Sequence, residues 1–552
     1  MKRIVSIFIL MAFLLSTALM TGCANTVSND SQTLEIYIGN FGYGYSWLDD
    51  EIDLFKEQSW VKEKYPELNI PTPQHNSENN FAGQRIITGE SNTIDLFFTT
   101  GSAASYFSRT DSSGNSYFED LRSLYFDREI PGEKGKTIAS KLKPEILDMQ
   151  EIQNLDKTKS YYGLPWVDGY MGLLYNKTLL KQYLGENYVL PRTTNELLAL
   201  AEDLSEKKTQ TGKSVVPFIS ASRASYWTQI FVTWWAQYEG TDSYDNYWNG
   251  LSDLGEYDGS IFAQDGRLEA LEVVESLIGR QHGFMHSDVS NLSFTAAQSK
   301  FLLGEGIMMA NGDWFENEMR ETQTENPYNY EITYMRMPVI SSIIKQCKSV
   351  KDDKALAFVV NQIDQNVAYE NAKVAYAANW NKFTDASNKE LAEGDYNRIS
   401  SARKLMYKID GHEAYIPAYA TAKELAKDFL LFLATDTAIE SFIDTTNGCG
   451  SPYLYDLATK NPEMYDSLPS IHKDRMKIAT EGVRIPSVNS YALSYLGGLQ
   501  ILARTTNLEI VFTAQNSDDR KTPQRVWQDD IDYYTANQYA NWNSLLMRAG
   551  LK

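Results

Sequence analysis

An α/β fold with a mainly parallel sheet is the class that the sequence predicts, because strand-like runs alternate with helical ones. Residues 34–38 alternate between apolar and polar side chains, which indicates a strand, and residues 94–98 form a second short apolar run. Between them, residues 49–64 repeat their apolar side chains at helical spacing. Strands that alternate with helices favour helices packed on a parallel sheet. The chain of 552 residues has room for roughly two to four domains.

Two further helices are marked by their first residues. Thr193 and Glu196 form the Thr-x-x-Glu pattern of a capping box, in which the threonine oxygen accepts a backbone N–H three residues on. Thr421 and Glu424 repeat this pattern in front of an amphipathic run. Residues 341–412 are instead polar with one apolar stretch, so we expect either a helical insertion or a segment near a hinge.

The N-terminus is typical of a secretory signal peptide that ends at a lipidation site. A positively charged start and an apolar run lead to a pair of small residues before Cys23. The pattern resembles a bacterial lipobox, although Met20 stands where Leu is usual; the alternative is an ordinary signal peptide with an incidental Cys. We therefore expect loss of residues 1–22, a lipid on Cys23 and a flexible polar tether over 23–33. The mature protein would then be held to the outer face of a bacterial cytoplasmic membrane by its lipid alone.

Charge and motif content argue against several kinds of partner and site. The formal net charge of −21 disfavours nucleic acid as a partner, because an acidic surface repels phosphates. No G-x-S-x-G, H-E-x-x-H or P-loop pattern is present, so neither a catalytic site nor a cofactor is expected. His282 and His286 have helical spacing but no third ligand nearby, which argues against a metal site. Cys347 and Cys449 could pair, or stay two buried thiols.

Four sequence blocks follow one another along the chain, at 161–177 (with YGLP and LYNK), 191–198, 301–314 and 422–433. In their motifs and their order they resemble the maltose-binding-like, sugar-binding group of extracellular solute-binding proteins of ABC importers. The length of the chain is similar to that of the large lipoprotein branch of the family, and the polar stretch over 341–412 departs from the pattern of its smaller members.

The resemblance implies a periplasmic-binding-protein-like fold. In such a fold two α/β lobes are joined by a hinge of three chain segments, and they close on a ligand in the cleft between them. The implied division is a signal peptide at 1–22, a lipidated Cys and tether at 23–33, a first lobe at 34–165 and 413–452, a second lobe at 166–340 and 453–552, and the polar insertion or hinge-proximal segment at 341–412.

Candidate ligand-binding residues follow from the position of loops and from the chemistry of sugars. Ligands of open α/β sheets bind beyond the carboxyl ends of the strands. A sugar needs aromatic faces for its C–H surface, and amides, hydroxyls or carboxylates for its hydroxyl groups. The candidates are Asn40, Tyr43, Trp47, Gly101, Ser102, Trp166, Asp168, Trp227, Asp313 and Trp314.

Several candidates also have a structural alternative. Trp314 could pack in the core, Asp313 could cap the following helix, and Trp166 could serve only to stiffen the hinge after Pro165. Trp227 belongs to an aromatic stripe at helical spacing, which is more typical of a buried helix face; Tyr226 or Trp227, at the start of that helix, could still face the cleft.

The function predicted from these observations is capture of a carbohydrate, most simply an oligosaccharide, and its delivery to the permease subunits of an ABC transporter by a monomeric lipoprotein. Two alternatives stay open at the sequence level. One is a secreted glycoside hydrolase, whose two carboxylates could come from any of the chain's 72 acidic residues. The other is a sensory binding lipoprotein that reports to a membrane kinase.

Overall fold

The computed structural model describes residues 31–39, 42–76, 86, 93–99, 112–153, 158–249, 251–252, 262–325, 328–383, 387–409, 412–485 and 507–533. The predicted signal peptide (residues 1–22), Cys23, Asn40, Gly101 and Ser102 lie outside these residues. Within the described part of the chain, no helix combines the length and the apolar character needed to cross a bilayer.

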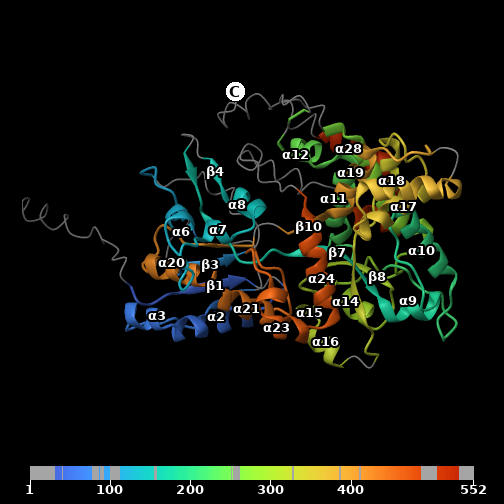
Figure 1. Ribbon diagram of the computed structural model, residues 1–552. Helices are drawn as coiled ribbons and strands as arrows, with labels where there is room; N and C mark the ends of the chain where they lie inside the picture. The colour runs from blue at the N-terminus through green and yellow to red at the C-terminus, as the bar shows by residue number, and fades with distance from the viewer. Residues whose placement is uncertain are drawn as a thin grey trace, which may run out of the picture.

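The chain forms two lobes, each built on its own sheet (Figure 1). The sheet of the first lobe has the strand order β2-β1-β3-β11-β6. β1 pairs in parallel with β2 and β3, whereas β11 runs antiparallel to β3 and β6. β1 and β3 are buried along their whole length, which confirms the two strands predicted from the apolar runs. The strands are β1 (Ile36–Gly39), β2 (Gln74–Asn76), β3 (Leu96–Thr99), β6 (Gly163–Pro165) and β11 (Glu413–Tyr415).

The sheet of the second lobe corrects the prediction of mainly parallel strands. Its order is β12-β10-β7-β8, with β9 also paired to β7, and β7 is antiparallel to β8, β9 and β10. The chain enters the lobe along β7 and leaves it along β10, so these two neighbours have opposite directions. The strands are β7 (Tyr170–Asn176), β8 (Met308–Gly312), β9 (Ile332–Met335), β10 (Leu405–Lys408) and β12 (Val483–Arg484); a short pair, β4 (Ile152–Gln153) and β5 (Lys159–Ser160), stands apart.

Three chain segments lie side by side where the lobes meet. The first connects β6 to β7, the second connects β10 to β11, and the third follows helix α21 (Asp436–Thr445). The Trp166 N–H donates to the His412 carbonyl at 3.2 Å, and the Asp168 N–H donates to the Gly450 carbonyl at 2.8 Å. Backbone hydrogen bonds between segments so distant in sequence make these crossings one hinge.

Helices lie on both sides of strands β1 and β3 of the first sheet (Figure 1). The predicted helix over 49–64 is two helices, because the chain turns to an extended conformation at Gln58. α2 packs against α21, which comes from the other end of the chain. The helices are α2 (Ser46–Glu57), α3 (Ser59–Lys64), α6 (Arg122–Phe126), α7 (Ile138–Lys141), α8 (Pro144–Gln150), α20 (Lys423–Phe432) and α21 (Asp436–Thr445), and the third crossing leads to α22 (Leu457–Lys460) and α23 (Pro462–Ser467).

The second lobe is mostly helical, and its centre is α11. Trp227, Phe231, Trp234 and Tyr238 are all buried on this helix, as the aromatic stripe predicted. The segment 341–412 forms α17, α18 and α19 and ends in the hinge strand β10, so it is helical. The helices are α9 (Lys177–Leu184), α10 (Thr194–Glu206), α11 (Tyr226–Glu239), α12 (Thr241–Asn249), α13 (Asp265–Ile278), α14 (Phe294–Leu302), α15 (Phe315–Glu318), α16 (Arg320–Glu325), α17 (Asp353–Asp364), α18 (Tyr369–Asn379), α19 (Glu393–Lys404), α24 (Ser470–Glu481), α27 (Leu508–Thr513) and α28 (Pro523–Tyr533).

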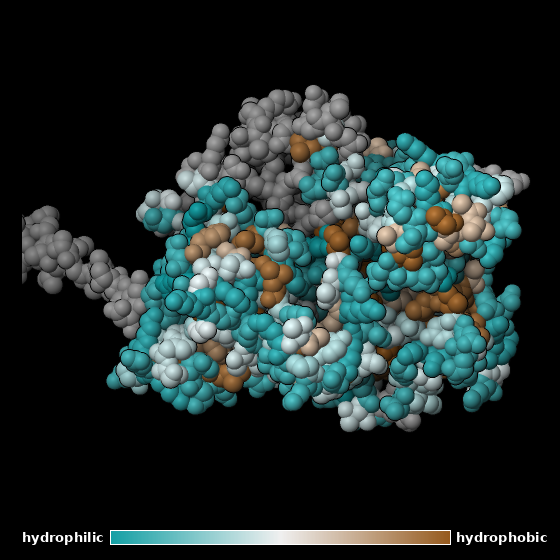
Figure 2. All heavy atoms as spheres, viewed as in Figure 1, coloured by the Kyte–Doolittle hydropathy of each residue, from teal (hydrophilic) through white to brown (hydrophobic). Residues whose placement is uncertain are grey.

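The polar surface and the two free cysteines agree with the acidic, cysteine-poor composition of the chain. The face seen in Figure 2 is mainly hydrophilic, with hydrophobic residues in separate patches on both lobes. Cys347 and Cys449 are buried free thiols in this structure rather than a disulfide.

The two predicted capping boxes have different outcomes. The Thr193 hydroxyl accepts the Glu196 N–H at 3.2 Å and caps α10 as predicted, while the Glu196 carboxylate accepts the Arg192 N–H instead of that of Thr193. The prediction for Thr421 is wrong, since α20 begins without a side-chain cap of its own. The buried Asp95, which precedes β3, supplies the acceptor: its Oδ1 takes the N–H groups of Thr421 (2.7 Å) and Ala422 (3.0 Å).

Asp95 should therefore matter more for stability than Thr421. We expect Asp95→Ala to lower the free energy of unfolding by about 2 kcal/mol, because it leaves the buried N–H of Ala422 and the partly buried N–H of Thr421 without an acceptor. Thr421→Ala should cost less than about 1 kcal/mol. Chemical denaturation of the two variants measures both values, and a larger loss for Thr421→Ala would contradict the assignment of the cap.

Candidate functional site

Candidate residues from both lobes converge at the hinge. Tyr43 follows β1 in the first lobe, Trp166 lies in the first crossing, and Asp313 and Trp314 follow β8 in the second lobe. The Tyr43 hydroxyl donates a hydrogen bond of 2.8 Å to Oδ1 of Asp313. The Tyr43 ring makes edge-to-face contacts with Trp166 and Trp314 at centroid distances of 5.7 and 6.1 Å. The loops at the carboxyl ends of β1 and β8 thus face each other across the two lobes.

Trp47 and a histidine that the sequence reasoning missed complete this aromatic group. Trp47, on the first turn of α2, stacks on Trp166 with centroids 5.0 Å apart and an angle of 14° between the rings. His412, in the second crossing, packs edge to face on Tyr43 at 5.5 Å and on Trp166 at 5.3 Å. Burial lowers the pKa of His412 to about 3, so its ring is neutral at physiological pH. A single histidine outside any motif gave no signal in the sequence.

Two glycines allow these aromatic rings to approach the backbone. Gly42 has φ +84°, and a Cβ there would lie 2.8 Å from the Trp314 ring. A Cβ at Gly169 would lie 2.4 Å from the Tyr43 hydroxyl oxygen. Any larger residue at either position would have to displace Trp314 or Tyr43.

The Asp313 carboxylate faces Tyr43 and does not cap a helix. The N-cap of the following α15 is Trp314, and this helix has no side-chain cap. Burial raises the pKa of Asp313, while the nearby charge of Arg475 and the Tyr43 hydrogen bond oppose the increase. Arg475, on α24, donates to the Asp313 carbonyl at 3.1 Å. Nothing local in the sequence around Arg475 indicated this contact.

Trp227 lies apart from the aromatic group between the lobes, whereas its neighbour Tyr226 contacts this group. Trp227 is completely buried and meets Phe218 at a centroid distance of 5.2 Å. The Tyr226 ring lies 6.0 Å from that of Trp314. Of the two residues at the start of α11, Tyr226 is therefore the one beside the interlobe group.

Asp168 is the centre of an ion-pair cluster at the hinge. Its Oδ2 lies 2.6 Å from Nζ of Lys143, on the first-lobe side, and 2.6 Å from Nζ of Lys408, at the end of β10. Its Oδ1 pairs with Arg484 of β12. Burial alone would raise the pKa of Asp168, but the charges of the three cations hold it well below its usual range.

Lys408, a member of the same cluster, has a lowered pKa. Burial and the positive charge of Lys143 lower the pKa of Lys408 to about 8, although Asp168 favours its charged form. The cluster joins residues of both lobes through the carboxylate of a residue in the first crossing. Among the described residues, no group of three or more His, Cys, Asp or Glu side chains is arranged to hold a metal ion.

Comparison with known structures supports the two-lobed fold. Three similar structures are described as a protein of xylan utilisation by the thermophilic bacterium Caldanaerobius polysaccharolyticus, maltose-bound MalE3 of T. maritima, and a chitin oligosaccharide binding protein. Their sequence identities are 15%, 14% and 12%, and their TM-scores are 0.56, 0.55 and 0.55. The alignments cover 91%, 91% and 92% of this chain and 99% of each other chain. Identities this low establish the fold alone.

Sequence comparison identifies the family. No curated protein sequence matches the chain significantly. Residues 53–364, more than half of the chain, match the family of the bacterial extracellular solute-binding protein. The match covers strands of both sheets, the first crossing and the loop with Asp313 and Trp314. This chain therefore belongs to the bacterial extracellular solute-binding proteins.

Proposed function

We propose that the protein captures a carbohydrate between its two lobes. The observation that carries this proposal is the aromatic group of Tyr43, Trp166 and Trp314, drawn from both lobes and the hinge, together with the Asp313 carboxylate that accepts the Tyr43 hydrogen bond. Aromatic faces pack on the C–H surface of a sugar ring, and a carboxylate accepts hydroxyl hydrogens. Such a ligand stabilises the closed arrangement because it touches both lobes.

The similar structures support the same class of ligand. Their descriptions name maltose, a chitin oligosaccharide and, in a further case with a TM-score of 0.51, raffinose. An oligosaccharide suits the several aromatic rings near the hinge, and Trp47, Trp166 and Trp314 are our proposed stacking residues. Asn40, Gly101 and Ser102, which come after β1 and β3 in the sequence, are proposed polar contacts.

Delivery to an ABC transporter permease completes the proposed function. We take the protein to be a monomer, bound to the outer face of the cytoplasmic membrane by a lipid on Cys23. A tether of about ten residues reaches at most roughly 35 Å and keeps the lobes close to a membrane partner. The first lobe would comprise 34–165 and 413–452, and the second 166–340 and 453–552.

A thermal-shift screen with a broad panel of mono- and oligosaccharides tests the ligand class. We expect at least one sugar to raise the unfolding temperature, because a ligand that binds only the folded state stabilises it. At a concentration of 100 times its Kd, the gain is about 2.7 kcal/mol. A screen in which peptides or polyols shift the unfolding temperature and no sugar does would overturn the carbohydrate assignment. Chromatography of the oligosaccharides after incubation should show no cleavage, and any cleavage would favour a glycoside hydrolase.

A further inference from the structure

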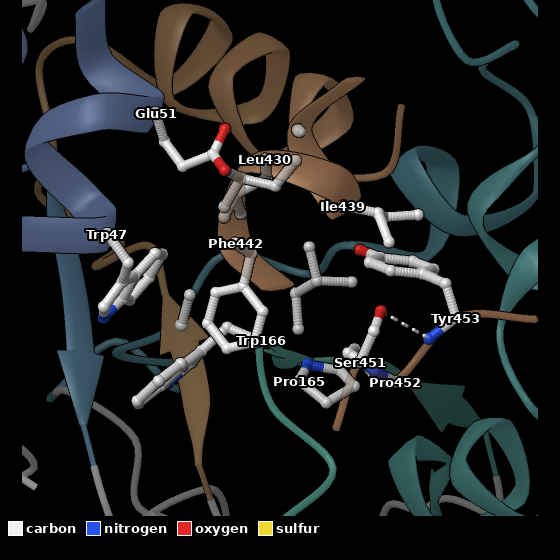
Figure 3. A pocket seen from close by; sticks show the side chains of 14 residues that line it. Trp47, Glu51, Pro165, Trp166, Leu430, Ile439, Phe442, Ser451, Pro452 and Tyr453 are labelled. Atoms are coloured by element: carbon white, nitrogen blue, oxygen red, sulfur yellow. Dashed lines mark hydrogen bonds between the residues drawn. The ribbon is translucent and has the colours of Figure 1, made fainter. Parts of the chain in front are cut away.

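A small cavity lies in the first lobe, beside the hinge, and Trp47 and Trp166 of the aromatic group at the lobe interface form part of its wall (Figure 3). Helices α2, α20 and α21 enclose it on one side, and Pro165 and Pro452 of two crossings enclose it on the other. Most of its wall is apolar, with Leu430, Ile439 and Phe442. Its volume of about 20 Å³ excludes a sugar but exceeds the roughly 10–15 Å³ that one water molecule requires.

Two polar side chains point into this cavity without a hydrogen-bond partner (Figure 3). Glu51, on α2, has an exposed fraction of 1%, and neither of its carboxyl oxygens meets hydrogen-bond geometry with a protein group, although the Ser441 side chain on α21 is near enough to favour the charged carboxylate. Tyr453, in the third crossing, has an exposed fraction of 4%, and its hydroxyl makes no hydrogen bond either. Buried polar groups in folded proteins are almost always paired, either with protein atoms or with ordered water. Two unpaired groups around one cavity of this size therefore indicate a bound molecule.

The protonation states of the two groups define what that molecule must offer. Burial raises the pKa of Glu51 to about 9; the hydroxyl of Ser441 on α21 opposes this shift, and the charge of Asp50 on α2 adds to it. Burial also raises the pKa of the Tyr453 phenol above its ordinary value. At neutral pH the cavity thus presents a carboxylic acid and a phenol, each able to donate one hydrogen bond and to accept others. Water, with two donors and two acceptors, complements both groups.

We propose that this cavity is a site for one ordered water molecule, hydrogen-bonded between the carboxylic acid of Glu51 and the hydroxyl of Tyr453. The water joins α2 to the third crossing of the hinge. Glu51 lies one helical turn after Trp47, so the bridge also anchors the turn that carries a candidate ligand-binding tryptophan. The proposed water site lies in the interior of the first lobe, so it does not depend on which ligand binds in the cleft.

Two substitutions of Glu51 separate a hydrated cavity from a dry one. Glu51→Gln keeps a donor and an acceptor for the water, whereas Glu51→Leu removes them and offers an apolar side chain to the apolar wall. We expect Glu51→Gln to have the higher midpoint of thermal unfolding at pH 7. An equal or higher midpoint for Glu51→Leu would show that the cavity is dry and would overturn the proposal.

The pH dependence of stability tests whether Glu51 carries a proton in the folded protein. The pKa of Glu51 is about 9 in the folded protein and near 4.5 in the unfolded chain. The folded protein therefore becomes less stable as the pH rises between these two pKa values. The midpoint of Glu51→Gln should therefore match that of the wild type near pH 4.5 and exceed it increasingly up to pH 9. Glu57→Gln, an exposed position on the same helix, is the control for the loss of a charge and should show no such trend.

Tyr453→Phe and a crystal structure keep the proposal testable if Glu51→Leu fails to fold. Loss of the hydroxyl should lower the midpoint of the wild type, because the water loses a partner, while a neutral or stabilising effect would contradict the bridge. A high-resolution structure of the wild type should contain one density peak within hydrogen-bond distance of both Glu51 and Tyr453. An empty cavity in that map would overturn the proposal directly.

Discussion

Replacing Asp168 by asparagine is expected to lower the free energy of unfolding by about 3 to 5 kcal/mol, the usual cost of removing one partner from a buried ion pair. The substitution removes the carboxylate that Lys143, Lys408 and Arg484 share, while the three positive charges stay close together. Denaturant unfolding of the purified protein at pH 7 measures this loss.

The pH dependence of this effect has a defined sign. The pKa of Asp168 is lower in the folded than in the unfolded protein, so its contribution is present above the unfolded value, near 3.8, and is lost as pH falls below it. The difference between wild type and Asp168→Asn should thus be largest at neutral pH and shrink in acid. Asp53→Asn, in an exposed pair with Lys56 at 3.8 Å, is the matched control and should change stability by less than about 0.5 kcal/mol. A similar loss for both variants would contradict the role of Asp168 as the centre of the cluster.

Trp314→Ala is expected to weaken binding of the sugar found in the thermal-shift screen by roughly 30- to 1,000-fold. This range corresponds to about 2 to 4 kcal/mol, which is typical for an aromatic residue at the centre of a binding site. The ring packs against the Gly42 loop of the first lobe and against Tyr43, so its loss removes both a stacking surface and a contact between the lobes. Isothermal titration calorimetry gives the affinity.

Trp60→Ala is the control for this prediction. Trp60 is a half-buried tryptophan on α3 that packs on Phe55, within the first lobe. Its removal should reduce stability but leave the affinity for the sugar within about twofold, because the contact belongs to one lobe only. Normal sugar binding by Trp314→Ala would show that the loop after β8 does not form the site.

Local signals in the sequence were sufficient for much of the secondary structure. The apolar runs at β1 and β3 and the threonine cap of α10 follow from patterns within a few residues, and the structure confirms them. The aromatic stripe of α11 likewise depends on helical spacing alone. The prediction for Thr421 failed for the same reason, since a local pattern cannot reveal that Asp95, 326 residues away, supplies the acceptor.

The sequence by itself determined the class of protein: a signal-peptide pattern, alternating strands and helices, and four ordered blocks that resemble solute-binding proteins. Only the tertiary structure decided how the candidates are used. It pairs Tyr43 with Asp313 across 270 residues, brings His412 and Arg475 to the same place, and surrounds Asp168 with three cations from separate segments. The physical reason is that propensity and amphipathic spacing act over one or two helical turns. Hydrogen bonds, ion pairs and buried protons depend instead on which distant segments the hinge brings together. No local sequence pattern encodes which segments meet.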